Sequence, residues 1–290
     1  MNLRQAIAAA FAQLAADEQL TAMASGDAEF LLLHTLGVSR ATLLAYPERE
    51  LTADQQIAYD CKVARRLTRE PIQYITGQQE FYGLAMKVSP AVLIPRPETE
   101  LLVEVVVKLL TGDRPLRIAD IGTGSGAIAI ALAVHLPRAE ITALDISAAA
   151  LAIAEDNAHK HRVAERIEFL QSDLLSAVMP LCGSFDAVVS NPPYVAELDR
   201  KTLHPEVREF EPASALFAGV SGLDVYQRLI PQALLALKPN GLLAMEIGQG
   251  QQIAIASLLD GWDNVLFLND LQTIPRVALA RRPQQGDATR

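Results

Sequence analysis

A glycine-rich loop at the end of a short apolar run constrains the fold of this chain more than any other feature. The apolar run covers residues 116–121, and a helical pattern follows from residue 128. Glycines at such a turn let the backbone approach a ligand, and the N-terminus of the next helix favours an anionic group. The sequence therefore predicts a strand–loop–helix unit that binds a nucleotide-like cofactor. The loop residues are Gly122, Thr123, Gly124, Ser125 and Gly126.

From residue 95 onward, short apolar runs alternate with helical patterns. This alternation is typical of an α/β fold, in which a parallel sheet has helices on both faces. We therefore expect a Rossmann-like domain over residues 95–290, with helices over 128–135 and 148–161. The expected strands are 116–121, 140–146, 166–170, 185–190 and 241–247, with 265–268 and 277–280 as further candidates.

The first 71 residues favour a small helical bundle instead. Leu3, Ile7, Phe11 and Leu14 recur at helical spacing and predict one apolar face. Further helices are expected over 28–36, after the capping residue Ser39, and from the Thr52–Gln55 capping box to about Glu70.

Residues 72–94 change to β-favouring side chains interrupted by Gly77 and Gly83. This pattern predicts a β-hairpin that links the two domains. The expected organisation is thus a helical domain over 1–71, a hairpin linker over 72–94, and an α/β domain over 95–290.

The composition of the chain indicates which binding partners and which cellular compartment to expect. The 290 residues carry a formal net charge of −9, which counts against a general nucleic-acid binder. Cys61 and Cys182 lack the spacing of a disulfide framework or zinc site, so no metal is expected. No uncharged apolar stretch approaches the roughly 20 residues of a membrane span, and the N-terminus indicates an amphipathic helix. We expect a cytoplasmic protein without direct contacts to membranes or nucleic acids.

Acidic residues near the predicted strand ends narrow the choice of cofactor. Asp145 ends the strand after the glycine loop, where a carboxylate suits the two ribose hydroxyls of a nucleoside. The loop and Asp145 alone fit NAD nearly as well as S-adenosylmethionine. Asp120, at a position to reach a methionyl amino group, and Asp173 with Leu174, at a position to contact adenine, favour S-adenosylmethionine.

The tetrapeptide Asn191-Pro192-Pro193-Tyr194 closes the fourth predicted strand of this domain. The prolines make the loop rigid, and the Asn191 side-chain oxygen and the Pro192 carbonyl can accept both hydrogens of a planar NH₂ group. Tyr194 offers an aromatic wall for a planar amide or base. An amide nitrogen is a poor nucleophile, so holding it in line with a methyl donor provides several kcal/mol. The pattern therefore predicts methyl transfer to a planar NH₂ group, with no dedicated general base.

Together with this tetrapeptide, three further segments make the chain resemble the PrmC/HemK family of peptide chain release factor glutamine methyltransferases. The resemblance implies a class I methyltransferase domain and a helical domain that helps to bind a protein substrate. It also implies methyl transfer from S-adenosyl-L-methionine to N5 of the glutamine in the Gly-Gly-Gln motif of release factors, a reaction linked to translation termination. The segments are residues 94–100 (Ile-Pro-Arg-Pro-Glu-Thr-Glu), residues 222–224 with Tyr226, and residues 246–248 (Glu-Ile-Gly).

The resemblance also assigns residues by position. It implies that Asn191 contacts both cofactor and substrate. Leu174 departs from the aromatic residue that some relatives have near adenine, and residues 270–272 lack an expected glycine in a peripheral turn. The implied cofactor residues are Gly122 to Gly126, Asp145 and Leu174, and the implied glutamine-binding residues are Asn191, Pro192, Pro193 and Tyr194.

Arg96 has two interpretations from the sequence. It can anchor the substrate at the mouth of the site, or it can form an ion pair with Glu98 or Glu100.

Three alternatives for the function stay open at this point. A glutamine methyltransferase of a ribosomal protein would share every motif. A DNA adenine N6-methyltransferase would hold an exocyclic amine in the same tetrapeptide, but it would need a basic surface for phosphates. A cofactor-binding interaction protein without turnover would not need Asn191.

Overall fold

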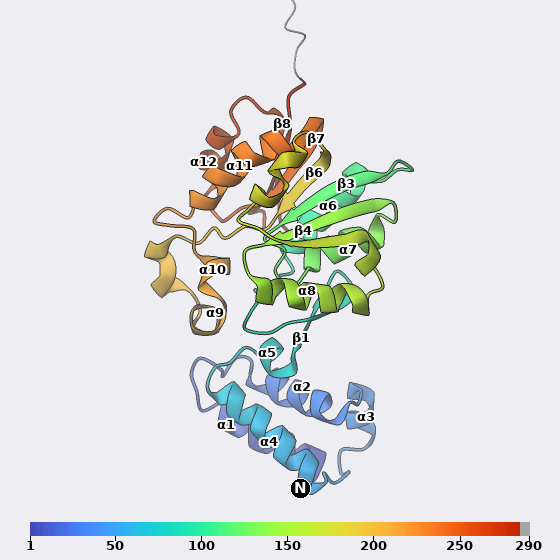
Figure 1. Ribbon diagram of the computed structural model, residues 1–290. Helices are drawn as coiled ribbons and strands as arrows, with labels where there is room; N and C mark the ends of the chain where they lie inside the picture. Colours follow the sequence, from blue (N-terminus) through green and yellow to red (C-terminus); the bar gives the residue numbers. More distant parts are fainter. Residues whose placement is uncertain (285–290) are drawn as a thin grey trace, which may run out of the picture. The chain divides into compact units, whose positions relative to one another are not determined.

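The computed structural model describes residues 1–284, and these residues divide into two compact units (Figure 1). The first unit comprises Met1–Gln78 and His204–Phe210. The second comprises Gln79–Leu203 and the described residues from Glu211 onward. These limits differ from the predicted limits at residues 71 and 94. Residues 285–290, the end of the predicted catalytic domain, lie outside the described residues.

Five helices from the N-terminal part of the chain build the first unit. Thr52 forms the predicted capping box with Gln55 through hydrogen bonds of 3.1 and 3.2 Å, and Ser39 caps the third helix. Gly37 ends the second helix in the left-handed conformation. The helices are α1 (Leu3–Leu14), α2 (Ala24–Leu36), α3 (Arg40–Ala45), α4 (Ala53–Leu67) and α5 (Ile72–Thr76).

The buried face of α1 differs in part from the predicted face. Leu3 and Leu14 are fully buried as expected, but Phe11 is 45% exposed. Ala6 and Ala10 are buried instead, and their small side chains let α1 pack closely against α2.

A segment from much later in the chain completes the first unit. Helix α9 (Pro205–Phe210) carries Glu206, whose carboxylate lies 2.6 Å from the guanidinium of Arg66 on α4. Asp27 of α2 lies 2.6 Å from the same guanidinium, which is 1% exposed. Two carboxylates therefore neutralise one buried cation, an arrangement that no local pattern in the sequence predicts.

The predicted linker is divided between the two units. Residues 72–76 form helix α5, not the first part of a hairpin, and belong to the helical unit. Strands β1 (Gln78–Phe81) and β2 (Leu84–Lys87) do form a hairpin. Phe81 and Met86 are buried in a core of the second unit, so the hairpin is fastened there by apolar packing and is not a free connector.

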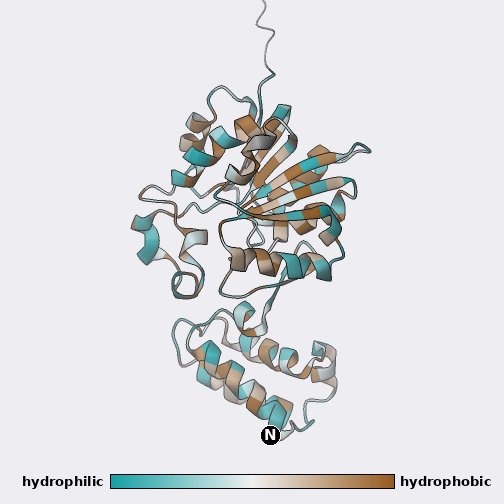
Figure 2. Ribbon diagram, viewed as in Figure 1, coloured by the Kyte–Doolittle hydropathy of each residue, from teal (hydrophilic) through white to brown (hydrophobic). Residues whose placement is uncertain are grey.

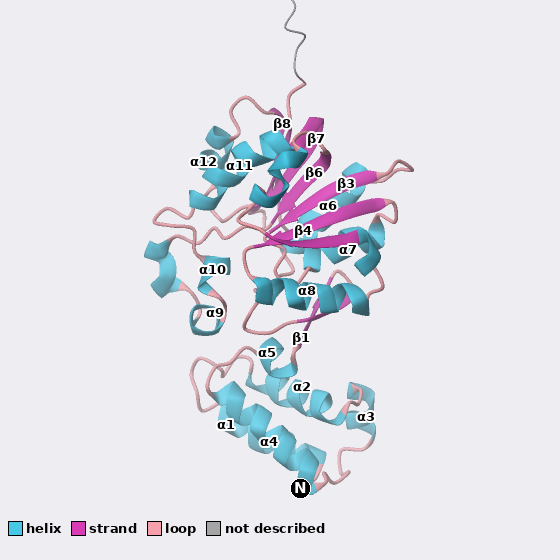
Figure 3. Ribbon diagram, viewed as in Figure 1, coloured by secondary structure: helices cyan, strands magenta, loops and turns pink. Residues whose placement is uncertain are grey.

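A seven-stranded mixed sheet forms the centre of the second unit (Figure 3). The strand order is β5-β4-β3-β6-β7-β9-β8. The predicted parallel arrangement holds from β5 to β7, whereas β9 runs antiparallel to both of its neighbours. A short turn joins β8 to β9, and such a turn can connect only antiparallel strands. The strands are β3 (Leu116–Ile121), β4 (Ala139–Asp145), β5 (Ile167–Gln171), β6 (Phe185–Ser190), β7 (Leu237–Glu246), β8 (Asp263–Asn269) and β9 (Pro275–Arg281).

Helices cover both faces of this sheet (Figure 1). Alternate residues of β3 serve the two cores: Leu116 and Ile118 face α6, α7 and α8, whereas Ala119 and Ile121 face α11 and α12. The central strands are mostly hydrophobic, as expected for strands buried on both faces (Figure 2). The remaining elements are α6 (Thr99–Leu110), α7 (Ala127–His135), α8 (Ala148–Lys160), η1 (Ala164–Arg166), η2 (Ser176–Leu181), η3 (Glu197–Thr202), α10 (Ala213–Leu216), α11 (Asp224–Ala236) and α12 (Gln252–Leu258).

The strand order reverses between β3 and β6. The last residue of β3, Ile121, pairs with Leu144 of β4 on one side and with Ser190 of β6 on the other. The Ser190 hydroxyl also donates a 2.7 Å hydrogen bond to the Ile121 carbonyl. The loops that follow β3 and β6 therefore leave the same edge of the sheet as neighbours, where open α/β sheets bind ligands.

Candidate active site

The glycine loop after β3 has the conformation that its composition predicts. Gly122, Gly124 and Gly126 all have positive φ, at 71°, 55° and 81°. No heavy atom lies within 4 Å of a Cβ added at Gly122, so the loop surface there is open. A Cβ at Gly126 would lie 3.1 Å from the Ala154 Cβ, which requires glycine where the loop packs on α8.

Asp120 supports the loop from behind. Its side chain is fully buried, and its Oδ2 accepts hydrogen bonds from the Thr123 hydroxyl at 2.7 Å and the Ala129 N–H at 3.1 Å. Its Oδ1 is buried without a partner among the described residues. Burial raises the pKa of Asp120 to about 7. Asp120 thus fixes the loop from behind through its hydrogen bonds with Thr123 and Ala129.

Asp145 connects the end of β4 to the same loop. Its Oδ2 accepts a 2.9 Å hydrogen bond from the Gly124 N–H, and its Oδ1 accepts one of 2.9 Å from the Ser147 N–H. Burial raises the pKa of Asp145, while these backbone hydrogen bonds lower it. An ionised carboxylate has about four acceptor positions, so two remain for a ligand.

A cavity of about 260 Å³ lies against this loop. The predicted residues Gly122, Gly124, Asp145 and Pro193 contribute to its wall, and so do Asp173 and Leu174. Other parts of the chain complete the wall, namely Ala91, Val92, Leu93, Ile121, Ile146, Ser147, Ala150, Ser172, Pro212, Ser214, Ala215, Val225 and Arg228.

The structure places the other predicted loop residues behind the cavity wall. Thr123 is 6% exposed and Ser125 is 3% exposed, and the Ser125 carbonyl accepts a 2.9 Å hydrogen bond from the Asn157 side chain. Like Asp120 and Gly126, they shape the loop and do not line this cavity.

Asp173 and Leu174 both reach the cavity, but in different ways. Asp173 forms a 2.5 Å ion pair with Arg228 of α11, a partner that the sequence did not indicate. Leu174 has a positive φ of 53°, which is uncommon for a residue with a Cβ, and it packs against the apolar core below α11.

The tetrapeptide leaves β6 next to the first turn of α6. Asn191 donates a 3.0 Å hydrogen bond from Nδ2 to the Thr99 hydroxyl oxygen. Thr99 in turn donates to Oε2 of Glu246 at 2.6 Å, and the Tyr194 hydroxyl donates to Oε1 of the same carboxylate at 3.2 Å. Burial raises the pKa of Glu246 to about 7, and burial and the Glu246 charge raise that of Tyr194. These four residues form one connected group, which we call the acceptor cradle.

Gln251 holds the main chain of the tetrapeptide. Its side-chain Nε2 donates to the carbonyls of Tyr194 at 3.0 Å and Gly222 at 3.2 Å, and its Oε1 accepts from the Gly248 N–H at 2.9 Å. A Cβ at Gly222 would lie only 2.3 Å from the Tyr194 carbonyl oxygen. Both glycines lie in segments that resemble the family, but no pattern in the sequence predicted Gln251, Thr99 or Glu246 as parts of the site.

Arg96 does not form the predicted ion pair with Glu98 or Glu100. It pairs with Glu211 instead, whose other oxygen accepts a 3.2 Å hydrogen bond from the Ile94 N–H. Glu211 lies far along the chain, so its pairing with Arg96 is a tertiary contact that a local reading of the sequence cannot supply.

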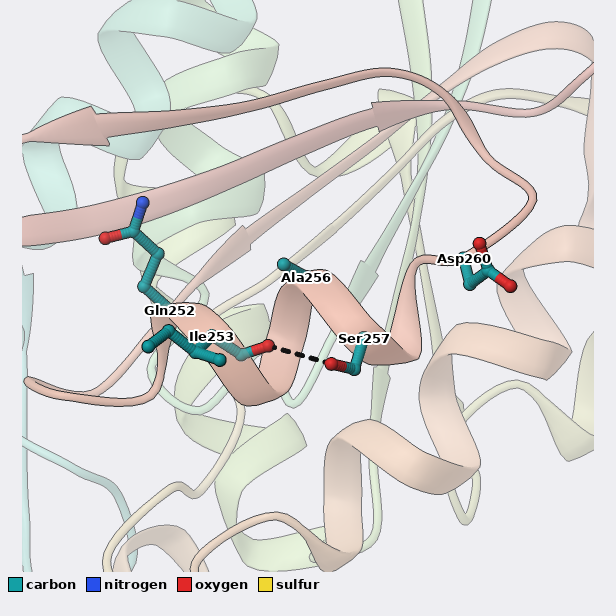
Figure 4. Close-up of a pocket in the computed structure, with 5 residues that line it drawn as sticks. All are labelled: Gln252, Ile253, Ala256, Ser257 and Asp260. Carbon is teal, nitrogen blue, oxygen red and sulfur yellow. Dashed lines mark hydrogen bonds between the residues drawn. The ribbon is translucent and has the colours of Figure 1, made fainter.

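A second hollow lies along α12 and shares no residue with the loop cavity (Figure 4). Its wall contains Gln252, Ile253 and Asp260, and the Ser257 hydroxyl donates to the Ile253 carbonyl within it. It has no buried charged group, so we do not assign it a catalytic role.

The described part of the chain shows neither a candidate metal site nor a candidate membrane-spanning helix. Among residues 1–284, no three His, Cys, Asp or Glu side chains are grouped so that they could hold a metal ion. None of the helices there has the length and apolar character that crossing a membrane requires.

The fold and the site define the class of this protein. Residues 97–209 match the family described as Methyltransferase small domain. A 16S rRNA N2 G1207 methyltransferase from T. thermophilus, solved with AdoMet and guanosine, has a similar fold, with a TM-score of 0.53 and 19% identity. The match covers 71% of this chain and 49% of that one. The second unit is thus a class I methyltransferase domain, and the protein is a methyltransferase.

Similarity along the whole chain identifies the family. Residues 5–77 match the PrmC N-terminal domain. The chain is 47% identical to a release factor glutamine methyltransferase from Koribacter versatilis, over 98% of this chain and 99% of that protein. It is 43% identical to one from Escherichia coli, over 88% of this chain and 91% of that protein. The chain therefore belongs to the release factor glutamine methyltransferase family, as the sequence motifs predicted.

Proposed function

We propose that this enzyme transfers the methyl group of S-adenosyl-L-methionine to the side-chain amide nitrogen of the glutamine in the Gly-Gly-Gln motif of peptide chain release factors. The observation that carries the proposal is the orientation of Asn191 in the acceptor cradle. Its Nδ2 is engaged by Thr99, and no described residue donates a hydrogen bond to its Oδ1. That oxygen is thus left to accept hydrogen from a planar NH₂ group beside the glycine loop.

The loop and its surroundings fit S-adenosyl-L-methionine. Gly122 leaves open space for a ligand, and Asp120 supports that loop from behind through its hydrogen bonds with Thr123 and Ala129. Asp145 lines the cavity at the position expected for the ribose hydroxyls, and Asp173 and Leu174 line it where adenine is expected. When bound, this cofactor supplies a methyl group on a positively charged sulfur, and no metal takes part in the proposal.

The residues of the cradle act by positioning the acceptor. The Oδ1 of Asn191 and the carbonyl of Pro192 accept the two hydrogens of the glutamine NH₂ group, while Pro193 and the Tyr194 ring border it. This grip restricts the rotation of the amide and keeps its nitrogen facing the methyl group. No side chain of the site is proposed as general base, because the nitrogen becomes acidic as its new bond forms and its proton can leave to water.

The helical unit is proposed to contribute to binding of the protein substrate, because it matches the PrmC N-terminal domain. Arg96 remains a candidate contact for that substrate, now as a residue held by Glu211. With translation factors as acceptors, the proposed location of the enzyme is the cytoplasm.

The competing acceptors have less support. The curated relatives align along nearly the whole chain and carry the release factor name, not that of a ribosomal protein methyltransferase. A DNA adenine acceptor requires phosphate contacts, and the net charge of −9 opposes them.

The proposal is tested by peptide mapping of a purified release factor after incubation with the enzyme and S-adenosyl-L-methionine. We expect one added methyl group on the Gly-Gly-Gln glutamine, and none on a release factor in which that glutamine is replaced by asparagine. Methylation of any other residue, or of the substituted factor to the same extent, would contradict the proposed acceptor.

A further inference from the structure

The hydrogen bonds of the acceptor cradle have a direction that can be worked out from one end. An ionised carboxylate only accepts hydrogen bonds, and a threonine hydroxyl has a single hydrogen to donate. At 2.6 Å from Glu246 Oε2, the Thr99 hydroxyl must donate that hydrogen to the carboxylate. Its oxygen is then able only to accept along the 3.0 Å contact with Asn191.

The direction of these two hydrogen bonds fixes the orientation of the Asn191 amide. Only the NH₂ end of the amide can donate to Thr99, so the oxygen end is turned to the other side. The opposite orientation would place two hydrogen-bond acceptors against each other at Thr99. It would also present an NH₂ group to the NH₂ group of the substrate.

We propose that Glu246 is a positioning residue that sets, through Thr99, which end of the Asn191 amide faces the acceptor nitrogen. The inference rests on the proposed function, since it explains how the acceptor-binding oxygen is selected. Glu246 touches neither substrate nor cofactor in this account. Its second oxygen holds the Tyr194 hydroxyl, so one carboxylate orders both ends of the tetrapeptide.

The surroundings of Glu246 leave this carboxylate little freedom. Glu246 is 1% exposed and Thr99 is 4% exposed, so water has little access to replace either partner. From α11, the Tyr226 hydroxyl donates a 2.8 Å hydrogen bond to the Glu246 carbonyl and fixes its main chain.

Ionisation of Glu246 links the cradle to pH. Burial raises its pKa to about 7, the charge of Arg276 on β9 favours the ionised form, and Glu98 beside α6 opposes it. The hydroxyls of Thr99 and Tyr194 donate to the carboxylate and also favour ionisation. When protonated, Glu246 can donate to Thr99, and the direction of the chain is no longer fixed. Turnover should therefore fall as the pH drops through about 7.

Two substitutions test the proposal together. Glu246→Gln keeps the size of the side chain but adds a donor, and Thr99→Val keeps the shape of Thr99 but removes its hydroxyl. Each should lower kcat about 100-fold while leaving the KM of the cofactor nearly unchanged, because the acceptor amide loses its orientation. The kcat of the double variant should be no lower than that of either single variant, since both substitutions interrupt the same series of hydrogen bonds. Thr99→Ser should recover most of the turnover that Thr99→Val loses.

The pH profile separates a directing role from a merely structural one. The acid limb of kcat should disappear in Glu246→Gln, which has no carboxyl group to titrate. The matched control is Glu98→Gln, which removes a nearby exposed charge outside the hydrogen-bond chain. It should keep the acid limb and move it to slightly lower pH, because Glu98 raises the pKa of Glu246.

Three results would overturn the inference: parental kcat in Glu246→Gln, multiplied losses in the double variant, or an unchanged acid limb in Glu246→Gln. Cofactor binding by calorimetry confirms that each variant is folded. If the parent enzyme itself fails to methylate a release factor, the proposed function fails and the inference fails with it. If the parent is active and the variants behave like it, only the inference fails.

Discussion

The glycine loop and the acceptor cradle lie side by side at one edge of the sheet, yet they are built in different ways. The loop is formed by one continuous stretch, Asp120 to Gly126, and its binding surface is mainly backbone. The cradle combines side chains from α6, the end of β6 and the end of β7, which are distant in the sequence. The proposed cofactor side therefore depends on backbone conformation, whereas the proposed acceptor side depends on a directed series of side-chain hydrogen bonds.

Because of this difference, the two regions should tolerate different kinds of substitution. A backbone surface accepts changes in side chains as long as the positive φ angles are kept. A series of hydrogen bonds to a buried carboxylate is interrupted when any member loses its donor or acceptor, because each bond needs both of its groups. Variants of the two regions should consequently differ in which kinetic quantity they change.

The largest effect should come from removing the acceptor-binding amide. Asn191→Ala should lower turnover about 100- to 1,000-fold, because the glutamine NH₂ group loses the oxygen that orients it. Cofactor affinity, measured by calorimetry, should stay close to that of the parent. Turnover equal to that of the parent would remove Asn191 from the cradle, and a large loss of cofactor affinity would erase the distinction between the regions.

The next largest effect should come from removing the Asp145 carboxylate on the proposed cofactor side. Asp145→Ala should weaken binding of S-adenosyl-L-methionine about 10- to 100-fold, because the ribose loses a charged hydrogen-bond acceptor. At saturating cofactor, kcat should fall much less than in Asn191→Ala. An unchanged affinity in calorimetry would show that Asp145 holds only the loop amides of Gly124 and Ser147.

A glycine pair tests whether the cradle also depends on close backbone approach. Gly222→Ala should lower the free energy of unfolding by about 1–3 kcal/mol more than Gly261→Ala does. Both glycines have positive φ, 74° and 80°, but only at Gly222 would the new Cβ meet an atom, the Tyr194 carbonyl oxygen at 2.3 Å. Chemical denaturation of both variants measures the difference. Equal losses would mean that strain alone, not the contact with Tyr194, requires the glycine.

A further effect concerns Asp120 and the pH dependence of stability. Because its pKa in the folded protein is raised to about 7 from 3.8, the folded state binds this proton more tightly than the unfolded state. That contribution is fully present below about pH 4 and is lost as the pH rises through about 7. Asp120→Asn lacks it, so its free energy of unfolding relative to the parent should improve between pH 4 and 8. Parallel stability curves over this range would contradict the raised pKa.

The sequence predicted the positions of the glycine loop and Asp145 correctly because the signals for them are local. The loop glycines, Asp145 and the tetrapeptide each follow a recognisable apolar strand, and adjacent strand ends bring them together. It predicted α1 to α4, α7, α8 and the seven strands of the sheet for the same reason, since periodicity and capping residues act over a few positions.

The rest could not be predicted because it depends on tertiary contacts. Glu246 and Thr99 lie in segments that resemble the family, but the sequence assigned neither residue a role. No local sequence pattern indicates that a carboxylate on β7 contacts a hydroxyl on α6. The pairing of Arg96 with Glu211 is non-local in the same way. Phe11 was assigned to the core by spacing, whereas close helix packing selected alanines.

The most direct test of the account is a competition among acceptors in one reaction. The enzyme is incubated with S-adenosyl-L-methionine, a release factor, a ribosomal protein and a DNA oligonucleotide, and the intact mass of each is measured over time. We predict the mass gain of one methyl group on the release factor and none on the other two. A gain on the ribosomal protein or the oligonucleotide, with the release factor unchanged, would contradict the assignment of the acceptor.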